Sequence, residues 1–119
     1  MKGLLLVAHG SRRAASNDEI RELTKLLRDR ASTDFDITSC AFLELAEPSI
    51  PDGIEECIQQ GATEVKVLPY FLSAGRHVAT DIPQEVKIKQ DEYPDMKIEI
   101  TPYLGESNAI VDILLSLSR

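Results

Sequence analysis

The chain has 119 residues, of which 43 % are hydrophobic and 28 % charged, and this length and composition are typical of one globular domain. Its net charge of −7 and its lack of tryptophan argue against nucleic-acid binding, which needs a basic surface or a stacking platform. No stretch approaches the roughly 20 apolar residues of a membrane span. His9 interrupts the first apolar run, which is too short for a secretion signal. We therefore expect a single cytoplasmic domain over residues 1–119.

Strands and helices are predicted in strict alternation from the spacing of the apolar residues. Strands are expected at residues 2–8, 36–43, 64–69 and 96–101, and helices at residues 17–31, 50–60, 82–92 and after residue 107. The helices are predicted to begin after the capping residues Ser16, Ser49, Asp81 and Ser107. Ser16 is supported by a capping box with Glu19, and Ser49 by Pro51 in the first turn.

This alternation predicts an α/β fold in which the strands pair in parallel through right-handed crossovers. We expect a single four-stranded parallel sheet with helices on both faces, in the flavodoxin-like strand order 2-1-3-4. Ligands of such sheets bind beyond the carboxyl ends of the strands, where the strand order reverses. That point lies between the first and third strands.

The two histidines of the chain are both expected at this point. His9 closes the first strand, His77 follows the third, and Glu44 follows the second. Two imidazoles and a carboxylate suit Co²⁺, Ni²⁺, Fe²⁺ or Zn²⁺, and a set without thiolate leaves coordination positions open. Imidazoles also suit proton transfer. Gly10 allows a sharp turn and a close approach of a ligand. Alternatively, His9 is a structural residue at the end of a strand.

Two further groups are expected to be structural. Cys40 and Cys57 do not form a C-x-x-C pair and lie in apolar segments, which predicts small buried side chains. Glu47 precedes the second helix, where a negative charge is favourable.

Three segments resemble the signature segments of the class II chelatases. They are Val-Ala-His-Gly-Ser-Arg at residues 7–12, Phe-Leu-Glu-Leu-Ala-Glu-Pro at 42–48, and Leu-Ser-Ala-Gly-Arg-His-Val-Ala-Thr-Asp-Ile-Pro at 72–83. The similarity covers essentially the whole chain and is greatest to the short, single-domain sirohydrochlorin cobaltochelatases and ferrochelatases of the CbiX/SirB type. The resemblance implies a chelatase-like fold and a lyase-type enzyme. Such an enzyme inserts Co²⁺ or Fe²⁺ into the tetrapyrrole sirohydrochlorin, without nucleotide hydrolysis, for cobalamin or sirohaem synthesis.

The resemblance also implies roles for particular residues. His9, His77 and Glu44 are the implied catalytic residues that contact the metal, and no cofactor is expected beyond this substrate metal. The expected substrate-binding residues are Gly10, Ser11, Arg12, Leu72, Ser73, Ala74, Gly75 and Arg76. Apolar surface for the macrocycle is expected at Tyr70, Phe71, Leu72 and Ala74, and cations for its carboxylates at Arg12, Arg13 and Arg76. Longer relatives contain two such domains that face each other, so a homodimer is expected.

Three alternatives differ in the chemistry they require. The metal could be Ni²⁺, for coenzyme F430, because His and Glu ligands discriminate poorly among these ions. The chain could also carry a transition metal without catalysis. A histidine phosphatase would need an arginine before the His-Gly pair, and Ala8 stands there.

Overall fold

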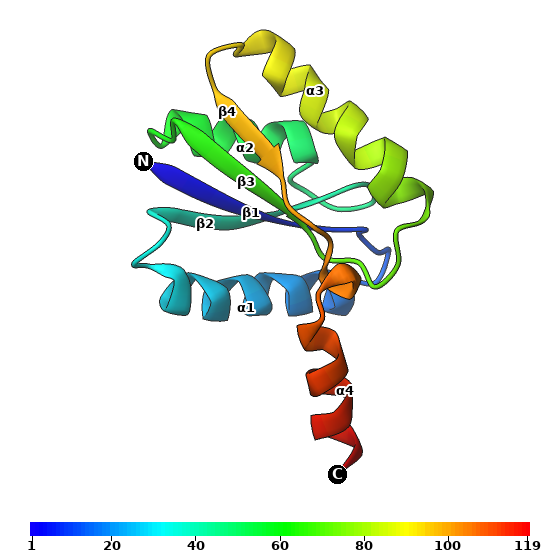
Figure 1. Cartoon of the computed structure of the whole chain (residues 1–119). Helices are drawn as coiled ribbons and strands as arrows, with labels where there is room; N and C mark the ends of the chain where they lie inside the picture. The colour runs from blue at the N-terminus through cyan, green and yellow to red at the C-terminus, as the bar shows by residue number, and fades with distance from the viewer.

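The computed structural model describes all residues from 1 to 119 and shows four parallel strands with helices around them (Figure 1). The main elements are β1 (Lys2–Ala8), α1 (Ala14–Ala31), β2 (Ile37–Phe42), α2 (Ile50–Gln59), β3 (Glu64–Pro69), α3 (Ile82–Glu92), β4 (Lys97–Ile100) and α4 (Ala109–Ser118). A π-helical turn (His77–Asp81) precedes α3, and a 3₁₀ turn (Leu104–Glu106) precedes α4. The strand order is β2-β1-β3-β4, so the predicted fold class and strand order are confirmed.

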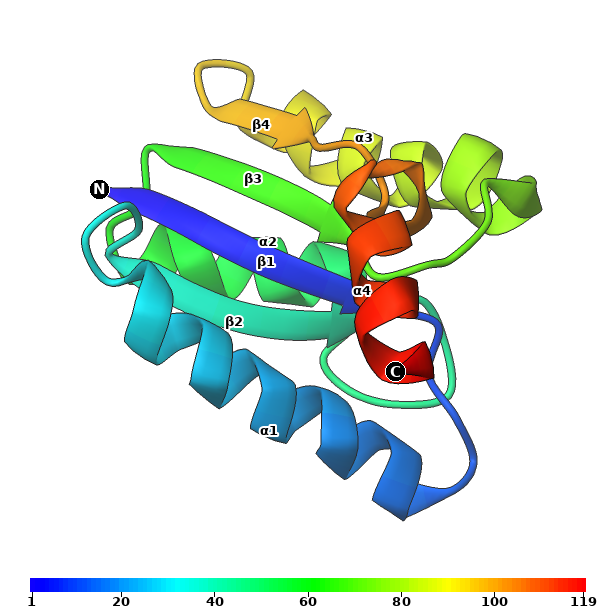
Figure 2. The same cartoon turned by 60° about the horizontal axis from the view of Figure 1, so that its bottom comes forward.

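Helices cover both faces of the sheet, with α1 on one face and α2 and α3 on the other (Figure 2). Leu5 and Val67 belong to the core cluster that also contains Ile54 of α2 and Ile82 of α3, and all four are fully buried. Neighbouring residues of a strand point to opposite faces. Because β1 lies between two strands and is buried on both faces after the exposed Lys2, its sequence from Gly3 to Ala8 is continuously apolar rather than alternating.

The α1 face of the sheet carries charges where it extends beyond α1. Lys66 lies opposite Leu4 and Glu99 in the strand register, so the three side chains share one face. Lys66 forms ion pairs with Glu99 and Glu64, and Lys97 forms ion pairs with the same two carboxylates. These ion pairs leave little apolar surface on β3 and β4 for a further helix.

Helix α4 does not pack on the sheet. It extends away from the body of the molecule (Figure 1), and its main contact is with the preceding 3₁₀ turn. The predicted last helix is therefore present, but its apolar side chains are largely exposed. The charged character of the uncovered face gives a physical reason, because burying those ion pairs under an apolar helix would cost desolvation energy.

The predicted helix starts were correct in part. Ser49 Oγ accepts a hydrogen bond from Asp52 N–H, as expected of a cap. Ser107 Oγ accepts from Ala109 N–H, although Asn108 occupies the capping position of α4. Ser16 and Asp81 were wrong, because α1 begins two residues before Ser16 and Asp81 has helical backbone angles with no capping hydrogen bond. The strands β2 and β4 are one residue shorter at each end than predicted.

The cysteines occupy the apolar surroundings that the sequence predicts. Cys57 is fully buried in the core, Cys40 is half-buried, and neither is in a disulfide. Burial raises the pKa of the Cys57 thiol, so this side chain behaves as a small apolar group. None of the helices combines the length and apolar character needed to cross a bilayer.

Candidate functional site

The loops that follow β1 and β2 run side by side at the carboxyl edge of the sheet. Leu43 N–H donates to the carbonyl of Ala8 at 2.9 Å, and Glu44 N–H donates to the carbonyl of His9 at 3.1 Å. These hydrogen bonds extend the parallel pairing of β1 and β2 by two residues. They therefore carry Glu44 directly beside His9.

Gly10 is needed where the two loops meet. Its φ of +94° lies in the left-handed region, and a Cβ there would stand 1.8 Å from the carbonyl oxygen of Glu44. The predicted sharp turn is confirmed, since only glycine adopts this conformation freely. The group that closely approaches Gly10 is the backbone of Glu44, and the approach of a ligand to Gly10 stays a prediction.

The three predicted chemical side chains come together. His9 Nε2 lies 3.2 Å from Glu44 Oε1, and the ring centroids of His9 and His77 are 4.7 Å apart in an edge-to-face arrangement. His9 and Glu44 are 41 % and 55 % exposed, and His77 is 45 % exposed. The set therefore lies on an open edge of the sheet, where a large substrate can reach it.

Each imidazole has a hydrogen-bond partner at Nδ1. His9 Nδ1 lies 2.9 Å from the carbonyl oxygen of Gly10, and His77 Nδ1 lies 2.8 Å from Asp81 Oδ2. A carbonyl or carboxylate oxygen only accepts, so these contacts favour a hydrogen on Nδ1 of both rings. The lone pair of neutral His77 is then on Nε2, whereas His9 Nε2 lies 3.2 Å from Glu44 Oε1, a second acceptor that favours a hydrogen on that nitrogen as well. Asp81 was not among the predicted site residues.

The arrangement is open rather than a finished metal centre. No three His, Cys, Asp or Glu side chains are grouped so as to hold a metal ion. His9 Nε2 and Glu44 Oε1 are nevertheless 3.2 Å apart. Two neighbouring ligand atoms that each lie about 2.1 Å from one metal ion are separated by roughly 3.0–3.4 Å, which is close to this distance. His9 and Glu44 can thus offer two adjacent ligands, and the ring centroid of His77 lies 4.7 Å from that of His9.

The predicted substrate loop lies between β3 and the π-helical turn. Leu72 is 74 % exposed and Tyr70 is 39 % exposed, whereas Phe71 is partly buried against the core with its ring 6.5 Å from His77. Ser73, Ala74, Gly75 and Arg76 are exposed. Gly105 supports this loop, because its N–H donates to the carbonyl of Phe71. A Cβ on Gly105 would stand 1.8 Å from the carbonyl oxygen of Leu72, a constraint that the sequence pattern did not reveal.

The predicted cations lie on the loops after β1 and β3 and have no partners within the chain. Arg12 and Arg13 precede α1, Arg76 precedes the π-helical turn, and all three are exposed. No guanidinium nitrogen of these three residues forms a hydrogen bond or ion pair within the chain. Their guanidinium groups are therefore free to pair with carboxylates of a bound molecule.

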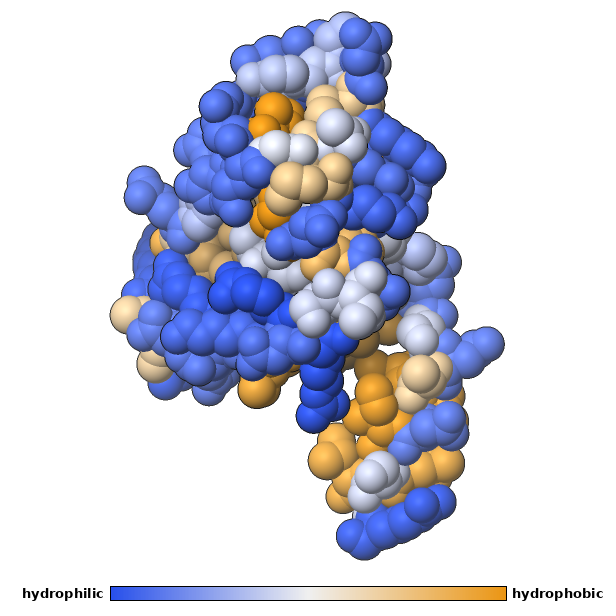
Figure 3. Space-filling view, turned by 90° about the vertical axis from the view of Figure 1, so that its left-hand side faces the viewer, coloured by the Kyte–Doolittle hydropathy of each residue, from blue (hydrophilic) through white to orange (hydrophobic).

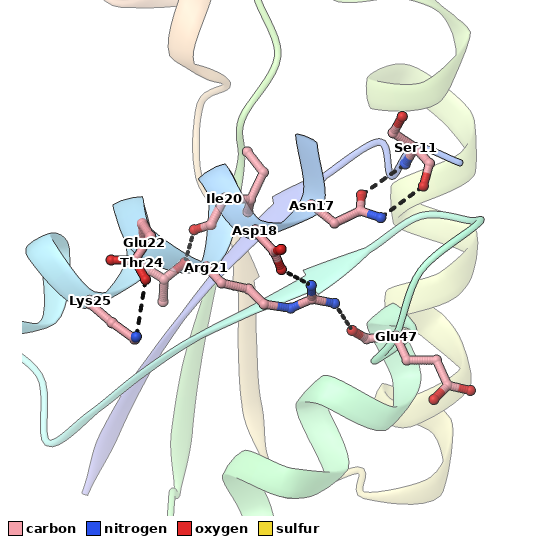
Figure 4. Close-up of polar contacts among 9 residues, drawn as sticks. All are labelled: Ser11, Asn17, Asp18, Ile20, Arg21, Glu22, Thr24, Lys25 and Glu47. Carbon is pink, nitrogen blue, oxygen red and sulfur yellow. Dashed lines mark hydrogen bonds and ion pairs between the residues drawn. The ribbon is translucent and has the colours of Figure 1, made fainter. Parts of the chain in front are cut away.

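Two side chains of α1 hold the site loops in place (Figure 4). Asn17 is buried, and its side chain both accepts from Ser11 N–H and donates to the carbonyl of Ser11. Arg21 donates to the carbonyl of Glu47 and to Asp18, and its guanidinium lies 5.2 Å from the Phe42 ring. Sequence reasoning missed Asn17, although a polar residue three positions before Ile20, in line with the apolar stripe of α1, was a visible signal.

Curated relatives of the chain are sirohydrochlorin chelatases. It is 41 % identical over 112 residues to the chloroplastic sirohydrochlorin ferrochelatase of Arabidopsis thaliana, covering 94 % of this chain and 49 % of that protein. It is 32 % identical over 114 residues to the sirohydrochlorin cobaltochelatase of Sulfolobus acidocaldarius, covering 96 % of this chain and 87 % of that protein. The chain spans about half the length, or less, of several curated relatives it matches.

The fold has a solved counterpart in the sirohydrochlorin chelatase SirB from Bacillus subtilis subspecies spizizenii in complex with cobalt. The TM-score is 0.86 at 30 % identity, covering 97 % of this chain and 48 % of that one. The CbiX family model matches residues 3–119. This match takes in all four strands and the residues around His9, Glu44 and His77. The chain belongs to the CbiX family.

Proposed function

We propose that this chain is a sirohydrochlorin chelatase, which inserts Co²⁺ or Fe²⁺ into sirohydrochlorin without nucleotide hydrolysis. The observation that carries the proposal is the pairing of the two histidines, whose ring centroids lie 4.7 Å apart, with the Glu44 carboxylate 3.2 Å from His9 Nε2. Relatives named as sirohydrochlorin ferrochelatases and cobaltochelatases support it.

The reaction exchanges two protons for one metal ion. The macrocycle loses the hydrogens of two pyrrole N–H groups, M²⁺ takes their place on the ring nitrogens, and no electron is transferred. One imidazole nitrogen cannot hold the metal and a proton together, so the protein needs more than one basic group at the ring. His9, His77 and Glu44 supply these groups, and the 3.2 Å contact allows a proton on His9 Nε2 to pass to Glu44.

The surroundings suit a flat, acidic macrocycle. Leu72 and Tyr70 offer exposed apolar surface on the loop that precedes His77. Arg12, Arg13 and Arg76 provide unpaired positive charge for the carboxylates of the substrate. These charges act locally against the overall charge of −7, which would otherwise repel a polyanion.

The test adds sirohydrochlorin and Co²⁺, Fe²⁺ or Ni²⁺ to the purified protein and follows metal insertion by the visible spectrum. We expect insertion faster than in a blank without protein, and we expect His9→Ala and His77→Ala each to lose most of this gain. Lys25→Ala is a matched control, because Lys25 is exposed on α1 and pairs only with Glu22. The absence of any gain over the blank, with metal still bound, would instead favour a metal carrier. A gain with Ni²⁺ alone would favour the nickel alternative.

A second copy of the chain is the partner we propose, in a homodimer held through α4. Five large apolar side chains of this ten-residue helix are about half exposed or more, namely Val111, Ile113, Leu114, Leu115 and Leu117. They form a continuous apolar surface (Figure 3), of a kind that proteins seldom leave open to water. Because the turn before α4 contacts Phe71 and Leu72, a second copy on α4 would lie beside the substrate loop.

A cytoplasmic location stays a prediction from the sequence.

The dimer is tested by sedimentation equilibrium of the chain and of Leu114→Glu. We expect the unaltered chain to have twice the monomer mass and the variant to shift to the monomer, because the new carboxylate would be buried in the interface. Lys87→Glu is the control, since Lys87 lies on α3 and is 71 % exposed. A monomer at all protein concentrations would contradict the proposed dimer.

A further inference from the structure

Asp81 is tied to the site by one contact. It lies one helical turn after His77, in the π-helical turn that leads into α3, and its Oδ2 is 2.8 Å from His77 Nδ1. The carboxylate makes no capping hydrogen bond to α3 and has no other polar partner in the chain. Its only interaction is therefore with the imidazole that we propose to meet the metal.

The contact decides which nitrogen of His77 faces the substrate. A carboxylate accepts and does not donate, so it selects the form of neutral His77 that carries its hydrogen on Nδ1. The Nε2 lone pair is then free for a metal ion or a proton. Without such a partner, a histidine side chain in water favours the opposite tautomer, in which Nε2 carries the hydrogen and cannot bind a metal.

The two histidines differ in the strength of this support. His9 Nδ1 donates to the neutral carbonyl of Gly10, whereas His77 Nδ1 donates to a charged carboxylate. Hydrogen bonds to an ionised acceptor are roughly twice as strong as neutral ones. A carboxylate on the far nitrogen also makes the ligating nitrogen more basic. His9 Nε2 also faces the Glu44 carboxylate at 3.2 Å, which favours a hydrogen on that nitrogen. His77 is thus held more firmly than His9 in the form whose Nε2 has a free lone pair.

We propose that Asp81 is a positioning residue that fixes the tautomer and orientation of His77 so that its Nε2 faces the incoming metal. The inference rests on the proposed function, in which His77 contacts the metal. Asp81 is not a catalytic residue in this scheme, because it touches His77 and neither the metal nor the macrocycle.

The first arm of the test needs no substrate and no metal. Nitrogen-15 spectra of the protein labelled at histidine show which ring nitrogen is protonated, and at pH 9 histidine side chains are ordinarily neutral. We expect His77 to carry its hydrogen on Nδ1 in the unaltered protein and to shift toward Nε2–H in Asp81→Ala. The matched control is Asp91→Ala, which removes a carboxylate that pairs with Lys87 at the same spacing on α3. An unchanged tautomer in Asp81→Ala would overturn the proposal.

The second arm measures Co²⁺ binding by titration of its visible absorption. Loss of such a supporting carboxylate typically weakens metal binding by about 10- to 100-fold, and we expect a loss in this range for Asp81→Ala and none for Asp91→Ala. A shifted tautomer with unchanged Co²⁺ affinity would overturn the link from Asp81 to the metal. His77→Ala separates this result from a failure of the proposed function, because unchanged Co²⁺ affinity in that variant would mean that His77 is not a ligand.

Discussion

The substitution Gly10→Ala should damage both the stability and the site. A Cβ at residue 10 would stand 1.8 Å from the carbonyl oxygen of Glu44, so the two loops must separate by more than an ångström. That movement breaks the hydrogen bonds from Glu44 N–H to His9 and from Leu43 N–H to Ala8, at about 1 kcal/mol each. The left-handed backbone adds about 1–2 kcal/mol for a residue other than glycine. The free energy of unfolding should therefore fall by about 3–4 kcal/mol.

Gly75→Ala separates the backbone effect from the steric one. Gly75 also has a positive φ, of +40°, but nothing lies within 4 Å of the position of its Cβ. This variant should lose only about 1 kcal/mol. For a domain of this size we expect Tm to fall by roughly 15 °C in Gly10→Ala and by roughly 5 °C in Gly75→Ala, as measured by circular dichroism. Equal losses in the two variants would refute the role given to the contact between Gly10 and Glu44.

Two further predictions concern the core and the helix layer. Hydrogen bonds from Gln59, Lys89 and Tyr93 lower the pKa of Glu55 to about 2, from an ordinary value of 4.5. Because the folded pKa is depressed, this stabilisation is present above pH 4.5 and is lost as the pH falls toward 2. Glu55→Gln should flatten the dependence of Tm on pH over that range, and an unchanged dependence would contradict this assignment. Cys57→Ala should lower the free energy of unfolding by about 1 kcal/mol, because it leaves a small cavity in the core, and Cys40→Ala should lower it by less. Metal insertion should be unchanged in both variants. A loss of insertion in either variant would argue against a purely structural role for that cysteine.

The sheet and the meeting of the histidines could be predicted because they follow from rules that act along the whole chain. Alternation of apolar strands and helices leaves few possible topologies, and the strand order determines which loops meet. Each of the three site residues, His9, Glu44 and His77, follows a strand directly or through a short loop. Their positions therefore depended on the strand order and not on side-chain packing or on the exact ends of the elements. The structure brings all three together.

The errors lie where a side chain had two possible partners. Asp81 has the residue type and position of a helix cap, yet its carboxylate binds His77, four residues earlier in the π-helical turn. Ser16 fits a capping box, but the side chain of Asn17 binds Ser11 and α1 begins earlier. Local propensity cannot choose among several nearby groups that could each bind one polar side chain. The exposure of α4 was equally hidden, because its apolar pattern is that of a buried helix.

The openness of the site is compatible with the proposed role of the metal as a substrate. Structural metal sites are closed by four ligands, whereas sites that act on a substrate keep a coordination position open, and His9, Glu44 and His77 lie on an exposed edge. His9 and His77 are each held at Nδ1 by an acceptor oxygen, which leaves Nε2 of His77 and the paired His9 Nε2 and Glu44 Oε1 as the atoms offered to an ion. Release then requires a stronger chelator on the open side of the edge, and the four nitrogens of a macrocycle provide one. In the proposed function, the exposed apolar side chain of Leu72 would be covered by the macrocycle when it binds, so the same open edge would admit both the metal and the tetrapyrrole.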